Sequence, residues 1–181
     1  MPELNFENGL RKANINTSDV NINTSIDFAA LAGAFIGGTG DFVNLFEPNA
    51  LKLEKESLGY IVASVGDKSG EMPYTAFNAR KNYINDNKEL LKGFTKAIDK
   101  GIKFVSDHTD EEVAHAIYNQ FPDLSLNDIM AIVKRYRGYD SWQENPFISE
   151  KLFNNLQDIM IDAQMIDKYA PYKDLVNNLY E

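Results

Sequence analysis

The sequence predicts an α/β fold, in which strand and helix units alternate in the first part of the chain and helices alone follow. Short apolar runs such as GYIVASV, residues 59–65, are bounded by glycine and polar residues, which is typical of buried strands. They alternate with segments whose apolar residues recur at helical spacing. After Lys81 only the helical spacing remains. This order predicts short, mostly parallel strands joined by crossover helices, followed by a helical C-terminal part.

Each element of the first part is predicted from local signals. Pro2 and Glu3 form a favourable first helical turn, because proline has the helical φ and an acidic side chain complements the helix dipole. Pro48 opens a further helix and favours an extended conformation in the residue before it. The expected strands are 20–23, 41–47, 59–65 and 74–79; the expected helices begin at Pro2, span 27–35 and follow Pro48; residues 66–73 form a loop.

The second part is predicted to contain amphipathic helices with recognisable N-terminal caps. Thr109 followed by Glu112 matches a capping box, in which each side chain bonds the backbone of the other residue. Ser125 is placed to cap the next helix. The expected helices are 88–106, the segment from Thr109 to Gln120, the segment after Ser125, 149–166 and 172–180.

The composition excludes several classes of function. The chain has 181 residues, 44% of them hydrophobic, and a formal charge of −9. Lysine and arginine are interleaved with acidic residues and form no basic patch, so no nucleic-acid partner is expected. Cysteine is absent, which removes disulfides, thiolate metal sites, cysteine nucleophiles and an acylated lipoprotein cysteine. We expect no signal peptide and no membrane-spanning segment, because no stretch is sufficiently long and apolar.

The stretch GGTGDFVNLFEPNA, residues 37–50, has the glycines of a phosphate-binding loop without its order of elements. A dinucleotide-binding loop follows a strand and precedes a helix, whereas here the helix comes first. The glycines are therefore expected to end that helix. Phe46 and Glu47 lie at the carboxyl end of the expected strand, where open α/β sheets bind ligands. Glu47 has two interpretations, a ligand contact or a charge that complements the dipole of the next helix.

No motif for catalysis or metal binding is found. His115 follows Glu111 at helical spacing, but neither zinc-protease pattern is completed around them. The sequence also lacks a nucleophile elbow and a Walker loop. Trp142, with Tyr136 and Tyr139, is interpreted as packing between helices. We therefore expect no enzyme activity, no metal and no cofactor.

Several segments together identify a family. The longest is GGTGDFVNLFEPNALKLEKESLGYIVASVGDKSGEMPYTAFNARKNYI, residues 37–84. It is preceded by PELNFENGLRKANI and followed by FPDLSLNDIMAIVKRY, WQENP and LFNNLQDIMIDAQMIDKYAPYKDLV. In this order and spacing they resemble solute-binding proteins of ABC importers, in the group of sulfonate, nitrate and taurine receptors and binders of thiamine-pyrimidine precursors. The resemblance covers essentially the whole chain.

The resemblance implies a fold of the periplasmic-binding-protein type (type II), in which two α/β lobes joined by a hinge close over a small ligand. This chain is similar to the C-terminal part of such a receptor, so we expect the N-terminal lobe to be missing. Residues 1–71 then form an incomplete second lobe with a short, mostly parallel sheet. Residues 72–181 form the return crossing and the helical C-terminal part.

The resemblance also implies a ligand-binding site. Asp41, Phe46 and Glu47 are expected on one wall of the cleft between the lobes, and Tyr74 and Thr75 near the hinge. Phe46 would stack on a planar ligand, and Glu47 would accept a hydrogen bond from an amine or ring N–H. The hydroxyl groups of Tyr74 and Thr75 would supply further polar contacts.

From this resemblance we expect a fragment of the substrate-binding component of an ABC importer. Its ligand would be a small polar organic solute, such as a sulfonate, a nitrate-like anion or a pyrimidine precursor. Its partner would be the importer's permease, and the full-length parent would lie outside the cytoplasm, in the periplasm or on the outer face of the cell membrane. The alternatives are a pyrimidine-precursor synthase of the same fold, or a homo-oligomeric fragment without ligand binding, because helices without their partner lobe expose apolar faces.

Overall fold

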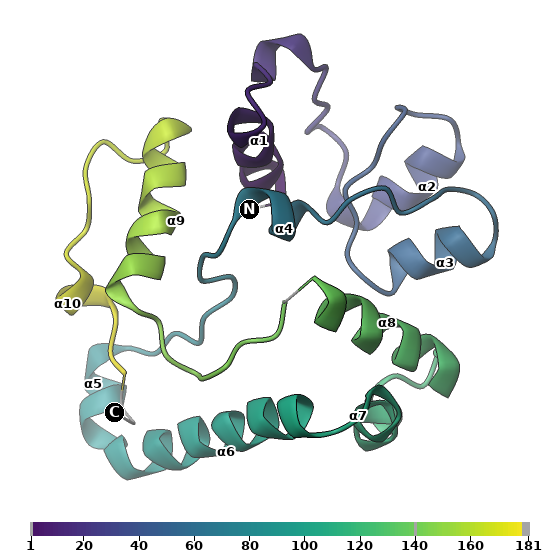
Figure 1. Ribbon diagram of the computed structural model, residues 1–181. Helices are drawn as coiled ribbons and strands as arrows, with labels where there is room; N and C mark the ends of the chain where they lie inside the picture. The colour runs from purple at the N-terminus through teal and green to yellow at the C-terminus, as the bar shows by residue number, and fades with distance from the viewer. Residues whose placement is uncertain (1, 140, 179–181) are drawn as a thin grey trace.

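The computed structural model describes residues 2–139 and 141–178 of the chain, and these residues form helices joined by extended segments (Figure 1). The α-helices are α1 (Pro2–Lys12), α2 (Leu31–Ile36), α3 (Asn49–Lys55), α4 (Val65–Ser69), α5 (Lys81–Asp86), α6 (Lys88–Asp107), α7 (Asp110–Ile117), α8 (Leu126–Gly138), α9 (Glu150–Asp162) and α10 (Tyr172–Leu175). Short 3-10 turns are η1 (Thr17–Asp19), η2 (Phe28–Ala30) and η3 (Tyr118–Gln120).

The predicted sheet is wrong for the residues that the structure describes, because none of them belongs to a strand. The segments that were expected as strands lie between the helices without a ladder of hydrogen bonds. A helix closes its hydrogen bonds within itself, but a strand needs a neighbour in register. Val65 differs in a further way, since it begins α4 instead of ending a strand. Ser64 caps that helix by accepting a hydrogen bond from the backbone N–H of Asp67.

The glycines after α2 end the helix, as the sequence predicted. The backbone N–H of Gly38 bonds the carbonyl of Phe35, and that of Thr39 bonds the carbonyl of Ala34, both at 2.9 Å. This pair of bonds forms a Schellman motif, in which one residue must adopt a left-handed conformation. Gly38 has a φ of 85°, a value that glycine adopts without a steric penalty.

The predicted caps of the second part are confirmed. Thr109 and Glu112 form a reciprocal capping box at the start of α7, and Ser125 forms another with Asp128 at the start of α8. The last long helix, α9, ends at Asp162, before the predicted boundary at residue 166. The predicted helix 172–180 is observed as the single turn α10, and its residues 179 and 180 lie outside the described residues.

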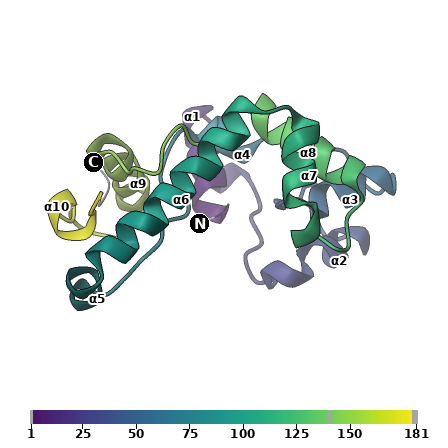
Figure 2. The ribbon, with the colours of Figure 1, turned by 90° about the horizontal axis from the view of Figure 1, so that it is seen from below.

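Buried apolar side chains concentrate where α7 packs against α8. The cluster consists of Val113, Ala114, Ile129 and Val133, each at most 2% exposed. A second contact joins α1 to α4, where the side-chain amide of the buried Asn8 donates to the carbonyl of Ser69 at 2.8 Å. In both views α2, α3, α7 and α8 gather at one end of the molecule, α5, α9 and α10 lie at the other, and α6 runs between them (Figures 1 and 2).

Candidate ligand-binding site

Three aromatic rings from separate segments meet at the start of α3. The ring centroids of Phe28 and Phe46 are 5.3 Å apart, and those of Phe46 and Tyr74 are 6.2 Å apart. The three residues are 47%, 43% and 41% exposed, respectively, so each presents part of its surface to solvent. These distances are typical of stabilising aromatic contacts. We call Phe28, Phe46 and Tyr74 the aromatic cluster.

Glu47, which follows Phe46, points its carboxylate into the protein. The side chain is 6% exposed, and Oε2 accepts a hydrogen bond from the backbone N–H of Leu51 at 2.9 Å. Its other oxygen, Oε1, forms an ion pair with Arg135 of α8. The carboxylate thus caps the first turn of α3, which is the helix-end interpretation given by the sequence. Ligand binding by Glu47 stays a prediction, and such a ligand would meet a carboxylate that already has two partners.

Arg135 holds two acidic residues of the α3 region at once. One guanidinium nitrogen, Nη1, bonds Glu47, and Nη2 lies 2.6 Å from Oε2 of Glu54. Burial opposes the charged form of Arg135, but the two carboxylates outweigh burial and raise the pKa of the guanidinium above its usual value. Because a guanidinium presents its donors in a planar fork, one side chain can satisfy both acids. Arg135 therefore fixes α3 against α8.

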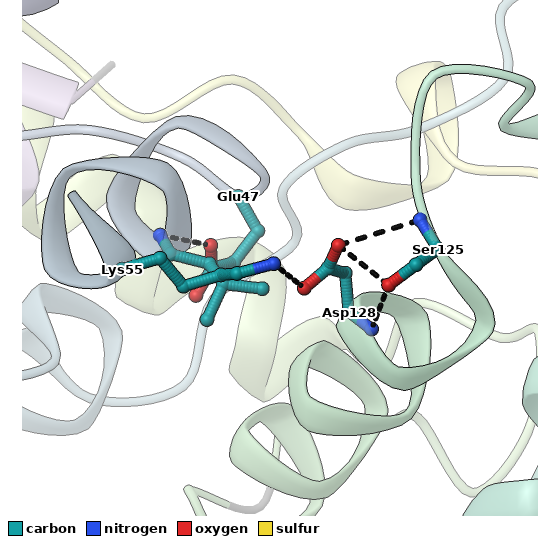
Figure 3. A network of polar contacts seen from close by, with 5 residues as sticks. Glu47, Lys55, Ser125 and Asp128 are labelled. Carbon is teal, nitrogen blue, oxygen red and sulfur yellow. Dashed lines mark hydrogen bonds and ion pairs between the residues drawn. The ribbon is translucent and has the colours of Figure 1, made fainter.

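A second ionic contact joins the same two helices (Figure 3). Lys55 Nζ lies 2.6 Å from Oδ1 of Asp128, and the Ser125 hydroxyl donates to Oδ2 of Asp128 at 2.7 Å. The hydrogen bond from Lys55, followed by that from Ser125, lowers the pKa of the Asp128 carboxyl below its usual value. Asp128 thus serves both the cap of α8 and the contact with α3. We call the contacts of Arg135 and Asp128 with the α3 region the ionic clamp.

Tyr136 and Trp142 pack beside the ionic clamp, in agreement with the packing role predicted for Trp142. Their rings meet edge to face, with centroids 6.0 Å apart. Burial of Tyr136 raises the pKa of its hydroxyl, so the group remains protonated and available as a hydrogen-bond donor. The contact packs the segment after α8 against Tyr136 of that helix.

The structure brings some of the predicted site residues together. Phe46 and Tyr74 share the aromatic cluster, and Thr75 follows Tyr74 on an exposed turn. Asp41 is exposed at the beginning of the segment that leads to Phe46, and Glu47 faces α8 instead of the cluster. The roles predicted for these residues in ligand binding remain predictions.

Two residues of this region were missed by the sequence analysis as site residues. Phe28 lies in the expected helix 27–35 and Arg135 in the expected helix after Ser125, and neither residue was singled out. Arg135 contacts Glu47 across 88 positions of sequence. No local pattern reports a contact at such a separation. The apolar spacing around Phe28 was visible in the sequence, but not its approach to Phe46.

Two clefts lie along α1, away from the aromatic cluster. One has a volume of about 180 Å³ and is almost wholly apolar; it is lined by Phe6, Gly9, Leu10, Ala13, Ala63, Ser64, Val65 and Lys68. The other, about 440 Å³, lies between α1 and α9; it is lined by Asn8, Arg11, Lys12, Ser69, Glu71, Asn155, Asp158, Ile159 and Asp162. Its cations and acids are mixed, so its charge favours no single class of ligand.

The histidines provide no metal site in the described part of the chain. His108 stacks on Phe104 with ring centroids 3.8 Å apart, and His115 lies 4.0 Å from Glu111 one helical turn away. Residues 2–139 and 141–178 contain no cluster of three or more histidine or acidic side chains arranged to hold a metal ion. In the same ranges, no helix combines the length and apolar character that crossing a membrane requires.

The aromatic cluster is suited to ligand binding. The rings are tilted to one another by 49° and 34°, so each half-exposed ring offers its own flat apolar face, and planar ligands stack on such faces. Glu47, the residue after Phe46, is held by the backbone N–H of Leu51 and by Arg135, which restricts the chain next to Phe46. The tyrosine in this cluster, Tyr74, also offers a hydroxyl group for a polar contact.

Comparison with known proteins finds one matching family and one similar relative. The family described as NMT1/THI5 like matches residues 2–112, which is more than half of the chain. The protein named "Putative binding protein YtlA" of Bacillus subtilis (strain 168) is 39% identical over 178 residues. That alignment covers 98% of this chain and 53% of the relative, so the chain spans about half the length of the relative it matches. No solved structure matches the chain.

Proposed function

Because the chain belongs to the NMT1/THI5-like family, we propose that it supplies one wall of a binding site for a small organic solute with a planar ring. The observation that carries the proposal is the aromatic cluster, in which Phe28, Phe46 and Tyr74 meet from three segments and remain half exposed. Buried rings would serve packing alone, whereas exposed faces are available to a ligand. A relative whose name describes a binding protein supports the same role.

Within this proposal, each candidate residue has a part. Phe46 stacks on the ring of the solute, and the hydroxyl groups of Tyr74 and Thr75 supply polar contacts at its edge. Asp41 and Glu47 lie at the two ends of the segment that carries Phe46. Asp41 is exposed and can meet a cationic group of the solute, while Glu47 acts mainly by holding the segment against Arg135. A pyrimidine precursor fits this set better than nitrate, because nitrate has no ring to stack.

The proposed context is import across a membrane. The chain would act as part of the substrate-binding component of an ABC importer, outside the cytoplasm, and would deliver its solute to the permease. Binding would require no covalent step, since selective stabilisation of a ligand-bound form is sufficient. The resemblance noted from the sequence supports this context, and the name of the relative supports a binding role.

A synthase of pyrimidine precursors is the second candidate, because the resemblance noted from the sequence includes such enzymes. The described structure gives this candidate less support. His108 and His115 lie at the end of α6 and on α7, and their side chains contact Phe104 and Glu111, not the aromatic cluster. Turnover of a candidate precursor by this chain, with or without added iron, would favour the synthase over the binding protein.

Calorimetric titration tests the proposal. The 181-residue chain is titrated with an aminopyrimidine, an aromatic sulfonate, taurine and nitrate, and the ring-containing solutes are expected to bind more tightly. Phe46→Ala should weaken binding of a ring-containing solute roughly tenfold, because the stacking contact is lost. Phe121→Ala is the matched control, since Phe121 is exposed to the same degree as Phe46 but lies after α7.

Two outcomes would argue against the proposal. The first is an absence of binding heat for every solute class at millimolar concentration. The second is equal weakening by Phe46→Ala and Phe121→Ala, which would show that the aromatic cluster is not the site. The same titration of the Bacillus subtilis relative, of which this chain covers 53%, shows whether residues beyond those matched here are needed for tight binding.

A further inference from the structure

The backbone of Phe46 is bonded to the first turn of α3. Its carbonyl accepts a hydrogen bond from the backbone N–H of Ala50 at 3.3 Å, and the side chain of the next residue, Glu47, accepts one from the backbone N–H of Leu51 at 2.9 Å. The Leu51 side chain is 7% exposed, so packing also holds this turn in place. A displacement of α3 would therefore carry the Phe46 ring with it.

Arg135 of α8 holds α3 at two points. It pairs with Glu47, which precedes the helix, and with Glu54 in the last turn of the helix. Two attachments to one planar guanidinium restrict rotation as well as translation, because a helix held at one point can still turn about it. The neighbouring Tyr136 adds a contact: burial raises the pKa of its hydroxyl, and a hydrogen bond with the backbone of Glu47 opposes that increase.

The contact between Lys55 and Asp128 joins the same two helices in different surroundings (Figure 3). The side chain of Arg135 is 21% exposed and that of Glu47 is 6% exposed, whereas the Lys55 side chain is 56% exposed. Solvent weakens an exposed ion pair, so the Lys55 contact restrains α3 less than the Arg135 contacts do. Lys55 is also the last residue of α3, at the opposite end of the helix from Phe46.

The other two rings of the aromatic cluster come from separate segments. Phe28 begins η2, and Tyr74 lies in the extended segment between α4 and α5. Among the described residues, the ion pairs of Arg135 are with the acids of the α3 region alone. Both ring contacts of the cluster involve Phe46, with centroids 5.3 Å and 6.2 Å apart. A shift of Phe46 with α3 would therefore change both of them.

We infer that Arg135 is a positioning residue of the aromatic cluster: through Glu47, it holds the Phe46 ring where a planar solute can stack on it. The inference rests on the proposed function, because the solute is the ligand proposed for this cluster. Arg135 acts through Glu47 and not by contact with the solute, since two carboxylates already occupy its guanidinium. Lysine is an incomplete replacement, because its ammonium lacks the planar fork that bonds both acids.

NMR of the solute-free chain tests the placement of the ring directly. In the native chain, nuclear Overhauser contacts should join the Phe46 ring to the rings of Phe28 and Tyr74. Arg135→Met should weaken both sets of contacts, because α3 is then free to shift. Lys55→Met is the matched control: it breaks the other contact between the same helices and should keep the ring contacts.

A double variant separates placement from stability. Arg135→Met with Glu47→Gln removes the buried charge as well as its partner, so the helices should be better retained than in Arg135→Met alone. The ring contacts should stay weakened, because Glu47→Gln does not restore the attachment to α8. Far-UV circular dichroism shows which variants keep their helices, and the ring contacts are compared among those variants.

Calorimetric titration with an aminopyrimidine measures the consequence for binding. Arg135→Met should weaken binding roughly fivefold, which is less than the roughly tenfold loss expected for Phe46→Ala. In the Phe46→Ala background, Arg135→Met should cause no further loss, because no ring remains to be placed. Arg135→Lys should recover part of the affinity, and Lys55→Met should keep the native affinity.

Unchanged ring contacts in Arg135→Met would overturn the inference, and so would an equal loss of these contacts in Lys55→Met. Additive losses of affinity for Arg135→Met and Phe46→Ala would also overturn it. The ring contacts are measured without solute, so the two proposals fail separately. Absence of binding by every solute contradicts the proposed function and leaves the positioning of Phe46 by Arg135 to be decided by NMR.

Discussion

The two parts of the chain differ in how they satisfy their backbone hydrogen bonds. From Lys81 to Gly138, helices follow one another closely, and two of them begin with reciprocal capping boxes. Between Ala13 and Arg80, short helices alternate with extended segments that have β-type sequences and no ladder. Helical bonds join residues four apart, whereas strand bonds require a partner from elsewhere. The helical part thus closes its backbone hydrogen bonds within its helices, whereas the extended segments form no ladder among the described residues.

Packing also varies along the chain. The α7–α8 cluster is almost completely buried. Large apolar residues are exposed in both parts, for example Tyr60 and Val62 in the extended part and Leu90 and Leu175 in the helical part. The ionic clamp joins the two parts through α3 and α8. Three predictions test this contrast, in order of decreasing effect.

The largest effect is expected in the helical core. Ile129→Ala removes a side chain that is 2% exposed and should lower the free energy of unfolding by about 3 kcal/mol, because it leaves a cavity between α7 and α8. Phe42→Ala, in the extended part, should change it by less than about 0.5 kcal/mol, since the ring is already in solvent. Urea unfolding followed by circular dichroism measures both values. Equal losses would show that the two parts are packed alike.

A smaller loss is expected when the clamp between the two parts is broken. Arg135→Met leaves the carboxylate of Glu47 buried without its cation and should cost about 2 kcal/mol of unfolding free energy. Adding Glu47→Gln should restore part of that loss, because the buried charge is then removed. Lys134→Met, at the exposed neighbouring position, is the control. A double variant that is as unstable as the sum of the single variants would contradict the proposed coupling.

The smallest effect is a pH dependence at the other half of the clamp. The pKa of Asp128 is lowered in the folded chain, first by the hydrogen bond from Lys55 and then by that from Ser125. The stabilisation is therefore fully present above the ordinary aspartate pKa of about 3.9 and is lost as the pH falls through the folded value. The urea midpoint should fall less between about pH 5 and pH 2 in Asp128→Asn than in the native chain. Identical pH profiles would exclude this contribution, and high salt should reduce it.

Local features of the fold were predicted with success. The caps at Thr109 and Ser125, the glycine stop after α2 and the long helix α6 each depend on residues within a few positions of one another. The strand 59–65 was predicted from equally clear local signals, and it was wrong because pairing depends on a distant neighbour. The last residue of this predicted strand, Val65, is instead the first residue of α4, and Ser64 caps that helix.

The candidate site shows the same limit. Phe46 and Glu47 could be selected from the sequence because they end a predicted strand directly before a proline, which is a recognisable pattern. The sequence could not show that Glu47 turns toward Arg135, nor that Phe28 and Tyr74 approach Phe46, because these contacts join residues far apart along the chain.

The sequence by itself determined the family, the positions of the caps and most helices, and the absence of cysteine chemistry. These properties are encoded in residue identity and short spacings. Only the tertiary structure decided which segments pair, which rings meet at Phe46, and that Arg135 binds both Glu47 and Glu54. The physical reason is that these contacts depend on where distant segments lie in space. An extended segment, in particular, forms a sheet only when a neighbouring strand accepts and donates its backbone hydrogen bonds.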